Sequence, residues 1–466
     1  MNYFVEKYRV DDVSETTLIK NGIVITVDRN RRIFEDGAVV IQGDRIIDVG
    51  KTHQVLKKKY RVDRVIDARK KAVIPGLVNT HIHSDLIRGT ADDMPLIEWL
   101  DYYISPWHWV VTPEIAHAAA MLTYAEALKS GTTCLADMFR YMHRCADAVK
   151  EIGIRAVLAP MAADSPVHKY ESFEDNEKLV RSRNGYAQGR VKVWFGIEWA
   201  FYSSDDHINK VVDGAKKYHT GIHIHSSEVK DEWQLAMKRF GKHPIEAFAD
   251  FGLLGKNTLI AHACWLTERE RQLLGQTKTN IAHCAVSNQK LADGVCPVPE
   301  LIKYGANVGL GTDGLKENNT ADMFEVMKFA SLLQKVTRLD ATVLPAYQVL
   351  EMATIKGAKS LGWDKEIGSL EVGKKADLIL VDLNKLRTTP VIFGEFFNVV
   401  SHLVYACHGD DVETVFVDGR MVMENHVLKN VDEQQIIDLA TKITPGILER
   451  RKQFQPRKKV LPARKR

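Results

Sequence analysis

The sequence predicts an α/β fold, namely a (β/α)8 TIM barrel with a small β-sandwich domain built from both chain termini. Three observations support this prediction. Short runs rich in apolar and β-branched residues alternate with stretches of helical periodicity through the middle of the chain. Strand-like segments with hairpin turns flank this alternation on both sides. The length of 466 residues suits a large barrel together with an accessory domain.

The segments near the two ends of the chain have the residue pattern of strands. They are rich in β-branched residues, and two of them contain the turn dipeptides Gly43-Asp44 and Asp418-Gly419, which favour hairpins. We expect the two terminal groups to meet in one small β domain. The segments are 17–28, 38–50, 376–382 and 412–422.

The central part of the chain contains eight candidate barrel strands. Helical periodicity between them, for example over 114–129 and 322–335, predicts a closed barrel of alternating strands and helices. The candidate strands are 73–81, 132–137, 154–160, 191–199, 221–225, 258–264, 280–284 and 306–312. The expected domains are the first part of the β-sandwich (1–72), the barrel (73–368), the second part of the β-sandwich (369–428), and a C-terminal helix with a basic tail (429–466).

The composition is that of an ordinary globular protein, with 45% hydrophobic and 27% charged residues. No apolar run approaches the ~20 residues that a membrane span needs. Residues 1–7 lack the apolar core of a secretory signal. The six cysteines are scattered without a CxxC pair, which is typical of reduced thiols, so we expect a cytoplasmic protein.

The net charge of +4 hides an uneven distribution. Residues 450–466 hold nine Lys or Arg and no acid, so the rest of the chain carries +4 minus 9, or −5. Such a tail can bind polyanions or can be a solvated, frayed terminus. We expect the second, and therefore expect neither a nucleic acid nor a membrane as partner.

His81-Ile82-His83 is the strongest chemical signal in the chain, because it ends an apolar run that reads as the first barrel strand. On a strand, residues i and i+2 point to the same face, so both imidazoles can reach one metal ion. Barrels of this type keep their chemistry at the C-terminal ends of the strands. The alternative is a pair of histidines in a surface turn.

Further candidate ligands stand at the ends of later strands. His225 ends the fifth candidate strand and Asp313 follows the eighth. A barrel brings all of its strand ends to one rim, so these residues converge with the first pair. The resulting set of three imidazoles and one carboxylate suits Zn²⁺ or Fe²⁺, with a water in the open position. The expected metal ligands are His81, His83, His225 and Asp313.

Three residues near this set can hold or move protons. A metal ion lowers the pKa of its bound water from 15.7 towards ~7, and Asp313 can accept the proton of that water. Glu228 can carry a proton to a ring nitrogen of the substrate, and His262 can hydrogen-bond the attacking hydroxide. The alternatives are that Asp313 is a turn residue and Glu228 a helix-start carboxylate. Their joint occurrence at strand ends favours catalytic roles.

Two other histidines stand on the same strands. We expect His223 to be a core histidine that turns away from His225. His283, at the end of the seventh strand, is either a pocket group or a core residue.

These motifs resemble the amidohydrolase superfamily, in particular the branch of adenosylhomocysteine-type and guanine-type deaminases and triazine hydrolases. The resemblance covers 17–425, and the stretches that carry it are 75–83, 95–100, 225–228, 261–262, 286–291, 311–314, 350–359 and 368–378. It implies one metal ion, usually zinc and in some members iron, with the same ligands and catalytic residues as above. It also implies the terminal β-sandwich and a homodimer or homotetramer. Binuclear members carry a carboxylated lysine on strand four; 193–199 contains none, which favours one metal.

The chain departs from the branch at two places. Nucleoside-type relatives carry Pro-His-x-Pro-Tyr after strand four, whereas 197–202 here reads Ile-Glu-Trp-Ala-Phe-Tyr. The absent histidine, which triazine hydrolases also lack, disfavours a nucleoside substrate. Glu317 stands where the branch often has a serine; it either binds a cationic amidine, guanidine or amino group, or faces solvent or pairs with Lys316. Trp99 either stacks on a planar ring or packs in the core.

The residues and the resemblance together predict a mononuclear metal-dependent aminohydrolase. The substrate would be a small amino-substituted heterocycle of the triazine, pyrimidine, purine or pterin type, and the products would include ammonia. Zn²⁺ is the expected metal, with Fe²⁺ second. The alternatives are hydrolytic dechlorination or dealkylamination of s-triazines, and deamination of an adenosine- or adenosylhomocysteine-type nucleoside. A non-catalytic binding protein on a degenerate barrel is disfavoured, because every expected ligand is present.

Overall fold

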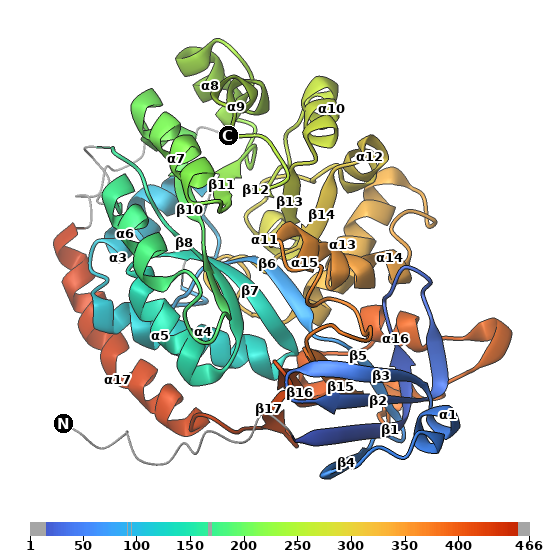
Figure 1. Cartoon of the computed structure of the whole chain (residues 1–466). Helices are drawn as coiled ribbons and strands as arrows, with labels where there is room; N and C mark the ends of the chain where they lie inside the picture. The colour runs from blue at the N-terminus through green and yellow to red at the C-terminus, as the bar shows by residue number, and fades with distance from the viewer. Residues whose placement is uncertain (1–14, 91, 95, 166–169, 455–466) are drawn as a thin grey trace.

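A computed structural model describes residues 15–90, 92–94, 96–165 and 170–454. Parallel strands form a central barrel with helices around it, and a mixed sheet lies against one end (Figure 1). Residues 1–7, Pro95 and most of the basic tail, on which parts of the sequence interpretation rest, lie outside the described residues.

The barrel strands run parallel in two hydrogen-bonded groups, β6-β7-β8-β9 and β10-β11-β12-β13-β14. The amide of Asp313 donates to the carbonyl of His81 at 2.9 Å, which connects the ends of β14 and β6. The amide of Glu198 donates to the carbonyl of Ala162 at 3.0 Å, which connects β10 with the chain after β8. The two groups therefore close into one ring. Their bounds are β6 Leu77–Ile82, β7 Thr132–Phe139, β8 Arg155–Pro160, β9 Val191–Val193, β10 Phe195–Trp199, β11 Ile222–Ser226, β12 Thr258–His262, β13 Asn280–His283 and β14 Asn307–Leu310.

Local sequence signals explain where the surrounding helices begin. Thr112 accepts a hydrogen bond from the amide of Ile115 at the start of α4, and Thr267 and Glu270 form a capping box at α10. The main helices are α4 Pro113–Lys129, α5 Met142–Ile152, α6 Phe173–Arg183, α7 Asp205–Lys217, α8 Glu232–Phe240, α9 Pro244–Phe251, α10 Glu268–Thr277, α11 Ala285–Lys290, α12 Val298–Tyr304, α13 Met323–Arg338, α14 Ala346–Met352, α15 Ile355–Ser360, α16 Val399–Tyr405 and α17 Glu433–Arg451. The helical periodicity over 114–129 and 322–335 is confirmed by α4 and α13.

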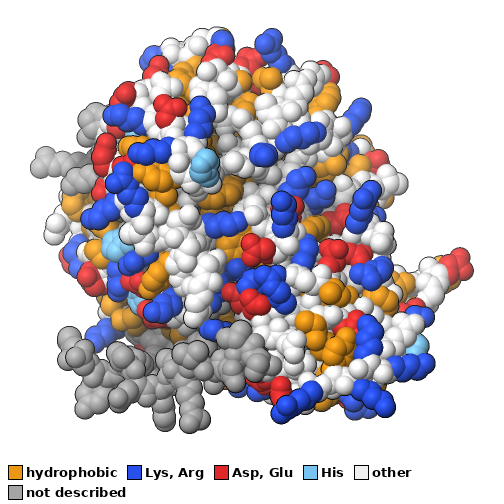
Figure 2. All heavy atoms as spheres, in the orientation of Figure 1, with side chains coloured by type: hydrophobic (Ala, Val, Ile, Leu, Met, Phe, Trp, Pro, Cys, Tyr) orange, Lys and Arg blue, Asp and Glu red, His pale blue; other side chains and the backbone are white. Residues whose placement is uncertain are grey.

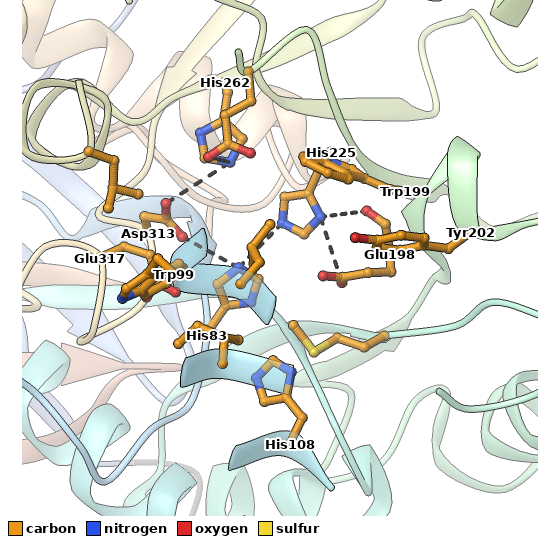
Figure 3. Close-up of a pocket in the computed structure, with 15 residues that line it drawn as sticks. His83, Trp99, His108, Glu198, Trp199, Tyr202, His225, His262, Asp313 and Glu317 are labelled. Carbon is orange, nitrogen blue, oxygen red and sulfur yellow. Dashed lines mark hydrogen bonds and ion pairs between the residues drawn. The ribbon is translucent and has the colours of Figure 1, made fainter. Parts of the chain in front are cut away.

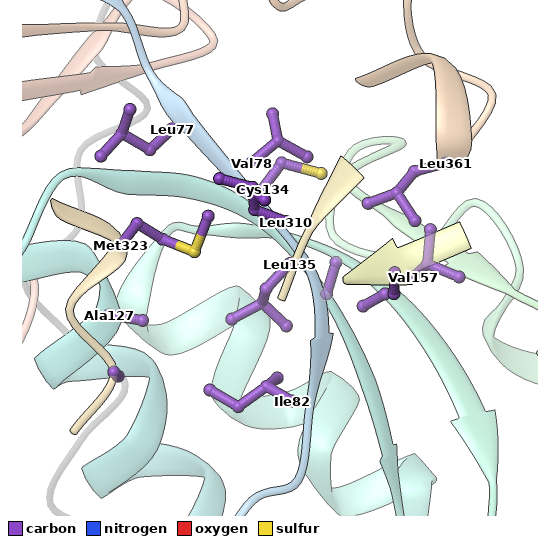
Figure 4. Close-up of a cluster of buried hydrophobic side chains, with 14 of the residues drawn as sticks. Leu77, Val78, Ile82, Ala127, Cys134, Leu135, Val157, Leu310, Met323 and Leu361 are labelled. Atoms are coloured by element: carbon purple, nitrogen blue, oxygen red, sulfur yellow. The ribbon is translucent and has the colours of Figure 1, made fainter. Parts of the chain in front are cut away.

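The barrel core is a continuous apolar cluster between strands and helices. Figure 4 shows part of it, in which Leu135, Val157 and Leu310 from three strands lie near one another. Outside, basic and acidic side chains are interspersed over the face drawn in Figure 2. No described helix combines the length and the apolar character that crossing a membrane requires. All six cysteines are free and buried.

Strands from both ends of the chain form one nine-stranded sheet in the order β18-β17-β16-β15-β5-β1-β2-β3, with β4 beside β1. Both expected hairpins are present, as β2–β3 and β16–β17. The N-terminal and C-terminal groups join where β5 and β15 pair antiparallel. The bounds are β1 Thr16–Ile25, β2 Ile33–Gln42, β3 Arg45–Lys51, β4 Arg64–Asp67, β5 Lys71–Pro75, β15 Leu378–Asp382, β16 Val412–Val417, β17 Arg420–Glu424 and β18 Val427–Leu428.

The architecture differs from the sequence prediction in three ways. One is that the predicted strand over 191–199 is divided into β9 and β10, which end and begin on either side of Trp194. The sequence predicts a two-layer sandwich, whereas the hydrogen bonds define a single sheet that curls until Ile46 of β3 and Phe416 of β16 share one apolar cluster. Such curling follows from strand twist accumulated over many strands. The sequence also predicts one strand over 73–81, but β5 belongs to this sheet and β6 to the barrel. Gly76 separates them where a Cβ atom would lie 2.1 Å from Thr133 Oγ1.

Arg155, the first residue of β8, fastens the sheet to the barrel. Its guanidinium binds both carboxylate oxygens of Asp377 at 3.0 and 3.1 Å, contacts Asp418, and lies 4.1 Å from the ring centroid of Trp363. Arg155 and Asp377 are both buried. The bidentate geometry satisfies two charges that would be costly to bury alone.

Replacing Arg155 with methionine is expected to lower the free energy of unfolding by about 3–5 kcal/mol, because Asp377 would stay buried without its cation. Urea unfolding followed by circular dichroism measures the change. The matched control is Arg69→Met, which removes the exposed ion pair with Asp67 and should matter far less because water already solvates both groups. Equal effects of the two substitutions would contradict this role of Arg155.

The C-terminal helix corrects the view of the tail as wholly solvated. Arg451, inside the basic segment, is only 9% exposed at the end of α17, whereas its neighbour Arg450 is exposed. Figure 1 shows α17 along the outside of the barrel near α3.

Candidate metal centre and active site

The four expected metal ligands converge at the C-terminal rim of the barrel. His81 Nε2 and His83 Nε2 each lie 3.4 Å from Asp313 Oδ1, and His225 Nε2 lies 3.3 Å from His83 Nε2. All four side chains are buried. Ligands 2.0–2.1 Å from a tetrahedral ion lie about 3.3–3.4 Å from one another, so the separations match those around one small divalent cation.

Hydrogen bonds behind the imidazoles orient two of them. His83 Nδ1 lies 2.5 Å from the carbonyl oxygen of Met138, and His225 Nδ1 lies 2.8 Å from that of Glu198. A carbonyl only accepts, so each Nδ1 donates and each Nε2 keeps its lone pair. Two lone pairs facing each other at 3.3 Å repel unless a cation lies between them, so the donor set fits a metal ion.

Two of the donors, His225 and Asp313, are held in the ionisation states that metal binding needs. Burial, with the neighbouring His83, holds the pKa of His225 well below its usual value, so this imidazole is neutral. Although burial opposes it, the pKa of Asp313 is held well below its usual value by His81 and the other imidazoles. Asp313 Oδ2 also accepts from the hydroxyl of Ser287 at 2.6 Å. Although burial opposes it, the carboxylates of Asp313 and Glu317 raise the pKa of His83, so this imidazole must release a proton when a metal binds.

Cys284 is a nearby group that the sequence interpretation does not use. One ligand atom each of His81, Cys284 and Asp313 lie within 4.8 Å of one another. Burial, followed by the charge of Asp313, raises the pKa of the thiol well above its usual value. A metal binds the thiolate rather than the thiol, so Cys284 is a weaker candidate than the imidazoles.

Glu228 and His262 lie beside the ligand cluster, as expected. His262 Nε2 is 3.6 Å from Glu228 Oε1 and 4.0 Å from Asp313 Oδ2. The side-chain amide of Asn288 donates to His262 Nδ1 at 3.0 Å, so Nε2 carries the hydrogen and faces the site. Burial lowers the pKa of His262 to about 4, which keeps the ring neutral. His262 is therefore placed to donate a hydrogen bond from Nε2.

Glu228 has the environment of a protonated acid. Its pKa is raised well above the usual value, first by burial and then by the carboxylates of Asp293 and Asp313. The loop that holds it is fixed by Glu232, whose carboxylate accepts from the amides of Ser227 and Glu228, both at 2.7 Å. Glu228 can thus deliver a proton within the pocket.

His223 is not the detached core residue that the sequence interpretation expects. Residues two apart on a strand share a face, so His223 points the same way as His225. Its Nε2 lies 3.0 Å from His81 Nδ1. His223 therefore orients the His81 ring through Nδ1, as the backbone carbonyls of Met138 and Glu198 orient the rings of His83 and His225.

A pocket opens beside the ligand cluster (Figure 3). Trp99 and Glu317, two of the expected substrate contacts, line it; the third, His283, is fully buried in the barrel and is not among the lining residues. Glu317 Oε1 is also 3.8 Å from the buried Nζ of Lys316, so the pocket position and the pairing with Lys316 coexist. Burial lowers the pKa of His283 to about 3.

Two lining residues, His108 and Glu198, have no signal in the sequence motifs, whereas Glu317 is an expected pocket residue. Both ring nitrogens of His108 and the Oε2 atoms of Glu198 and Glu317 are buried without a hydrogen-bond partner among the described residues. Such groups are costly unless a ligand or water satisfies them. Residues far apart in sequence, from strand β10, from short helices and from the chain after α11, supply these polar and apolar lining groups; they include His108, Glu198, Trp199, Tyr202 and Leu291.

Sequence comparison places these observations in a family. The amidohydrolase family model matches residues 72–422. 5'-Deoxyadenosine deaminase from Methanosarcina barkeri is 39% identical over 437 residues, which are 93% of this chain and 98% of that protein. 5-Methylthioadenosine/S-adenosylhomocysteine deaminase from Thermoanaerobacter pseudethanolicus is 37% identical over 93% of this chain and 99% of its own length.

Comparison with solved structures gives the same result as the sequence comparison. An adenosine deaminase from Xanthomonas campestris with bound zinc has a TM-score of 0.88 at 30% identity, covering 93% of this chain and 98% of its own. Atrazine chlorohydrolase from Arthrobacter aurescens, complexed with zinc, has a TM-score of 0.84 at 23% identity over 92% of this chain and 100% of its own, which shows the fold alone. The chain belongs to the amidohydrolase family. The predictions of this family and of a hydrolase are confirmed.

Proposed function

We propose that this chain is a zinc-dependent aminohydrolase that removes the amino group of adenine from an adenosine-type nucleoside without a 5'-phosphate. The observation that carries the proposal is the convergence of three imidazoles and one carboxylate, linked by three donor–donor separations of 3.3–3.4 Å, beside the buried acid Glu228. The names of the two deaminase relatives supply the nucleoside class. All proposed site residues lie within 73–368, the proposed barrel domain.

The proposed metal ligands are His81, His83, His225 and Asp313. When bound, the metal ion supplies a water whose pKa is lowered towards ~7 and which therefore attacks at neutral pH. Zn²⁺ suits this nitrogen-rich donor set, and Fe²⁺ is the second choice.

The remaining steps belong to side chains of the chain itself. Asp313 takes the proton from the attacking water as its oxygen adds to the amino-bearing ring carbon. Glu228 donates its proton to the adjacent ring nitrogen, and His262 Nε2 hydrogen-bonds the added oxygen. Asp313 then returns its proton to the amino group and ammonia leaves, while the remaining hydroxyl proton passes to the Glu228 carboxylate as the carbonyl forms, which restores both side chains.

The charge of the pocket favours a nucleoside over a nucleotide. Carboxylates line it, whereas no Lys or Arg does among the described residues. A phosphate would therefore find acidic side chains and, among the described lining residues, no Lys or Arg to bind it. 5'-Deoxyadenosine, in the name of one relative, has no 5'-oxygen that could carry a phosphate. The lining carboxylates are Glu198, Glu228, Asp313 and Glu317.

Glu198 is a candidate to replace the histidine that is missing from the nucleoside-type motif. The sequence interpretation takes that absence as evidence against nucleosides, but two relatives that match nearly the whole chain carry nucleoside names. Glu198 lies in the corresponding stretch and lines the pocket, and its Oε2 makes no hydrogen bond among the described residues, although it lies 3.7 Å from His225 Nδ1. Burial raises its pKa to about 7, so near neutral pH it offers both a donor and an acceptor. We propose that Glu198 makes the polar contact that the histidine would make.

A substrate panel tests the proposal. Zinc-loaded enzyme should release ammonia from 5'-deoxyadenosine, methylthioadenosine or adenosylhomocysteine with kcat/KM at least about 10²-fold above that for AMP, guanine or an aminotriazine. A coupled ammonia assay, with the absorbance change of the purine as a second readout, measures these rates. Preference for AMP would contradict the phosphate argument. Chloride or alkylamine release from triazines without nucleoside turnover would favour hydrolytic dechlorination or dealkylamination. The support for that alternative is the similarity in fold to atrazine chlorohydrolase.

A further inference from the structure

One wall of the pocket is a short, irregular helical segment. It consists of α2 Leu96–Trp99, the π-helix η1 Leu100–Ile104 and α3 Ser105–His108. Four of its residues line the pocket, and none of them is a proposed metal ligand. They are Trp99, Leu100, Ile104 and His108.

The sequence explains why this segment is irregular. Pro106 has no N–H, and its ring would clash with the carbonyl four residues earlier in a regular α-helix. That carbonyl belongs to Tyr102. The backbone widens into the π-helix at this point, as single-turn π segments often do near functional sites. The Tyr102 carbonyl therefore lacks the donor that a regular helix would provide.

Arg451, nearly 350 residues later in the chain, supplies that donor from the end of α17. Its Nη2 donates to the Tyr102 carbonyl at 2.8 Å, and its Nε donates to the Tyr103 carbonyl at 3.3 Å. The guanidinium carbon lies 4.3 Å from the centroid of the Tyr103 ring. The planar fork thus binds two adjacent carbonyls and lies over the Tyr103 ring, a combination that lysine cannot reproduce.

A second contact from the same helix end strengthens the attachment. The ring of Phe454 lies 5.7 Å from that of Trp109, edge to face, one residue beyond α3. The end of the C-terminal helix and the residues just after it therefore contact the wall in its middle, at Tyr102 and Tyr103, and the residue just beyond its end, Trp109.

We propose that Arg451 is a positioning residue for substrate binding, which acts by holding the Trp99–His108 wall of the pocket in place. The role rests on the proposed function only in that the wall serves the same substrate. Without Arg451 the segment would have to become ordered as the substrate binds, so affinity would fall. The metal ligands, on other elements, would stay in place.

The test compares R451A with R450A in the full-length, zinc-loaded protein. Arg450 is the exposed neighbour on the same helix, so it controls for loss of charge. For R451A we expect at least a fivefold rise in KM for the preferred nucleoside, kcat within twofold of wild type, and unchanged zinc content. Amide hydrogen exchange over 99–110 should become at least tenfold faster in R451A. R450A should match wild type in every measurement.

Two further results test the positioning role of Arg451 even if R451A folds poorly or the proposed substrate is wrong. R451K keeps the charge but not the planar fork, so its exchange over 99–110 should lie between wild type and R451A, while R450K should match wild type. Exchange needs no turnover, so it separates this inference from the proposed reaction. Unchanged exchange over 99–110 in both Arg451 variants would overturn the proposal, as would a fall in kcat with KM unchanged.

Discussion

Replacing His81 with alanine is expected to remove the bound metal and lower kcat/KM by at least about 10⁴-fold. His81 belongs to the cluster of donor atoms linked by separations of 3.3–3.4 Å, and its Nε2 has no hydrogen-bond partner among the described residues. Losing one of four ligands leaves an incomplete site, and an unactivated water returns to a pKa of 15.7. Metal analysis by mass spectrometry and steady-state kinetics measure the two effects.

The control for this substitution is His53→Ala, which changes an exposed histidine on α1 Thr52–Lys57. It should keep one zinc per chain and wild-type activity. Circular dichroism would show whether H81A retains the fold, since ligand loss and unfolding predict different spectra. An H81A protein with full zinc content and more than a tenth of wild-type activity would rule out the metal centre at this position.

Replacing Glu228 with glutamine is expected to lower kcat by about 10²–10⁴-fold while zinc content stays unchanged. Glutamine keeps the shape of the side chain and a hydrogen-bond donor but cannot transfer a proton. The raised pKa of Glu228 and its distance of 3.6 Å from His262 Nε2 place the transferable proton inside the pocket. Because glutamine keeps the shape of the side chain and a hydrogen-bond donor, KM for the substrate should change far less than kcat. Glu228 is not among the proposed metal ligands, so the zinc should stay bound.

Asp231→Asn is the matched control for Glu228→Gln. Asp231 is an exposed carboxylate three residues further along the same loop, so this change removes a charge nearby without touching the pocket. D231N should behave as wild type. If E228Q kept wild-type kcat, or if it lost its zinc, the acid would have to be assigned to another group.

Hydrophobic periodicity was enough to find most of the fold. The strands after His81 were predictable because parallel strands buried on both faces read as short apolar runs. The hairpins were predictable because Gly43-Asp44 and Asp418-Gly419 are local turn signals. The division between β5 and β6 was not, because the apolar run continues through Gly76 and only the contact with Thr133 reveals the break.

The candidate site also contains residues that the sequence could predict and residues that it could not. The expected metal ligands, with Glu228 and His262, converge in the structure because each follows a barrel strand, and a closed barrel brings strand ends together. Glu198 and His108 could not be assigned, since their importance lies in unpartnered atoms that face the pocket. For His223 the signal was present, but the prediction put its side chain on the wrong face of the strand: residues two apart share a face, so it points the same way as His225.

By itself the sequence determined the family, the barrel, the hairpins and the residue types of the metal site, because these depend on short-range patterns and on motifs at strand ends. Tertiary structure alone decided that the terminal strands form one curled sheet, that Arg155 joins this sheet to the barrel, and that Arg451 reaches the carbonyls of Tyr102 and Tyr103. These features depend on contacts between residues hundreds of positions apart. The free energy of such contacts comes from burial and from pairing charges and carbonyls in three dimensions, and no local pattern records which distant partner will supply it.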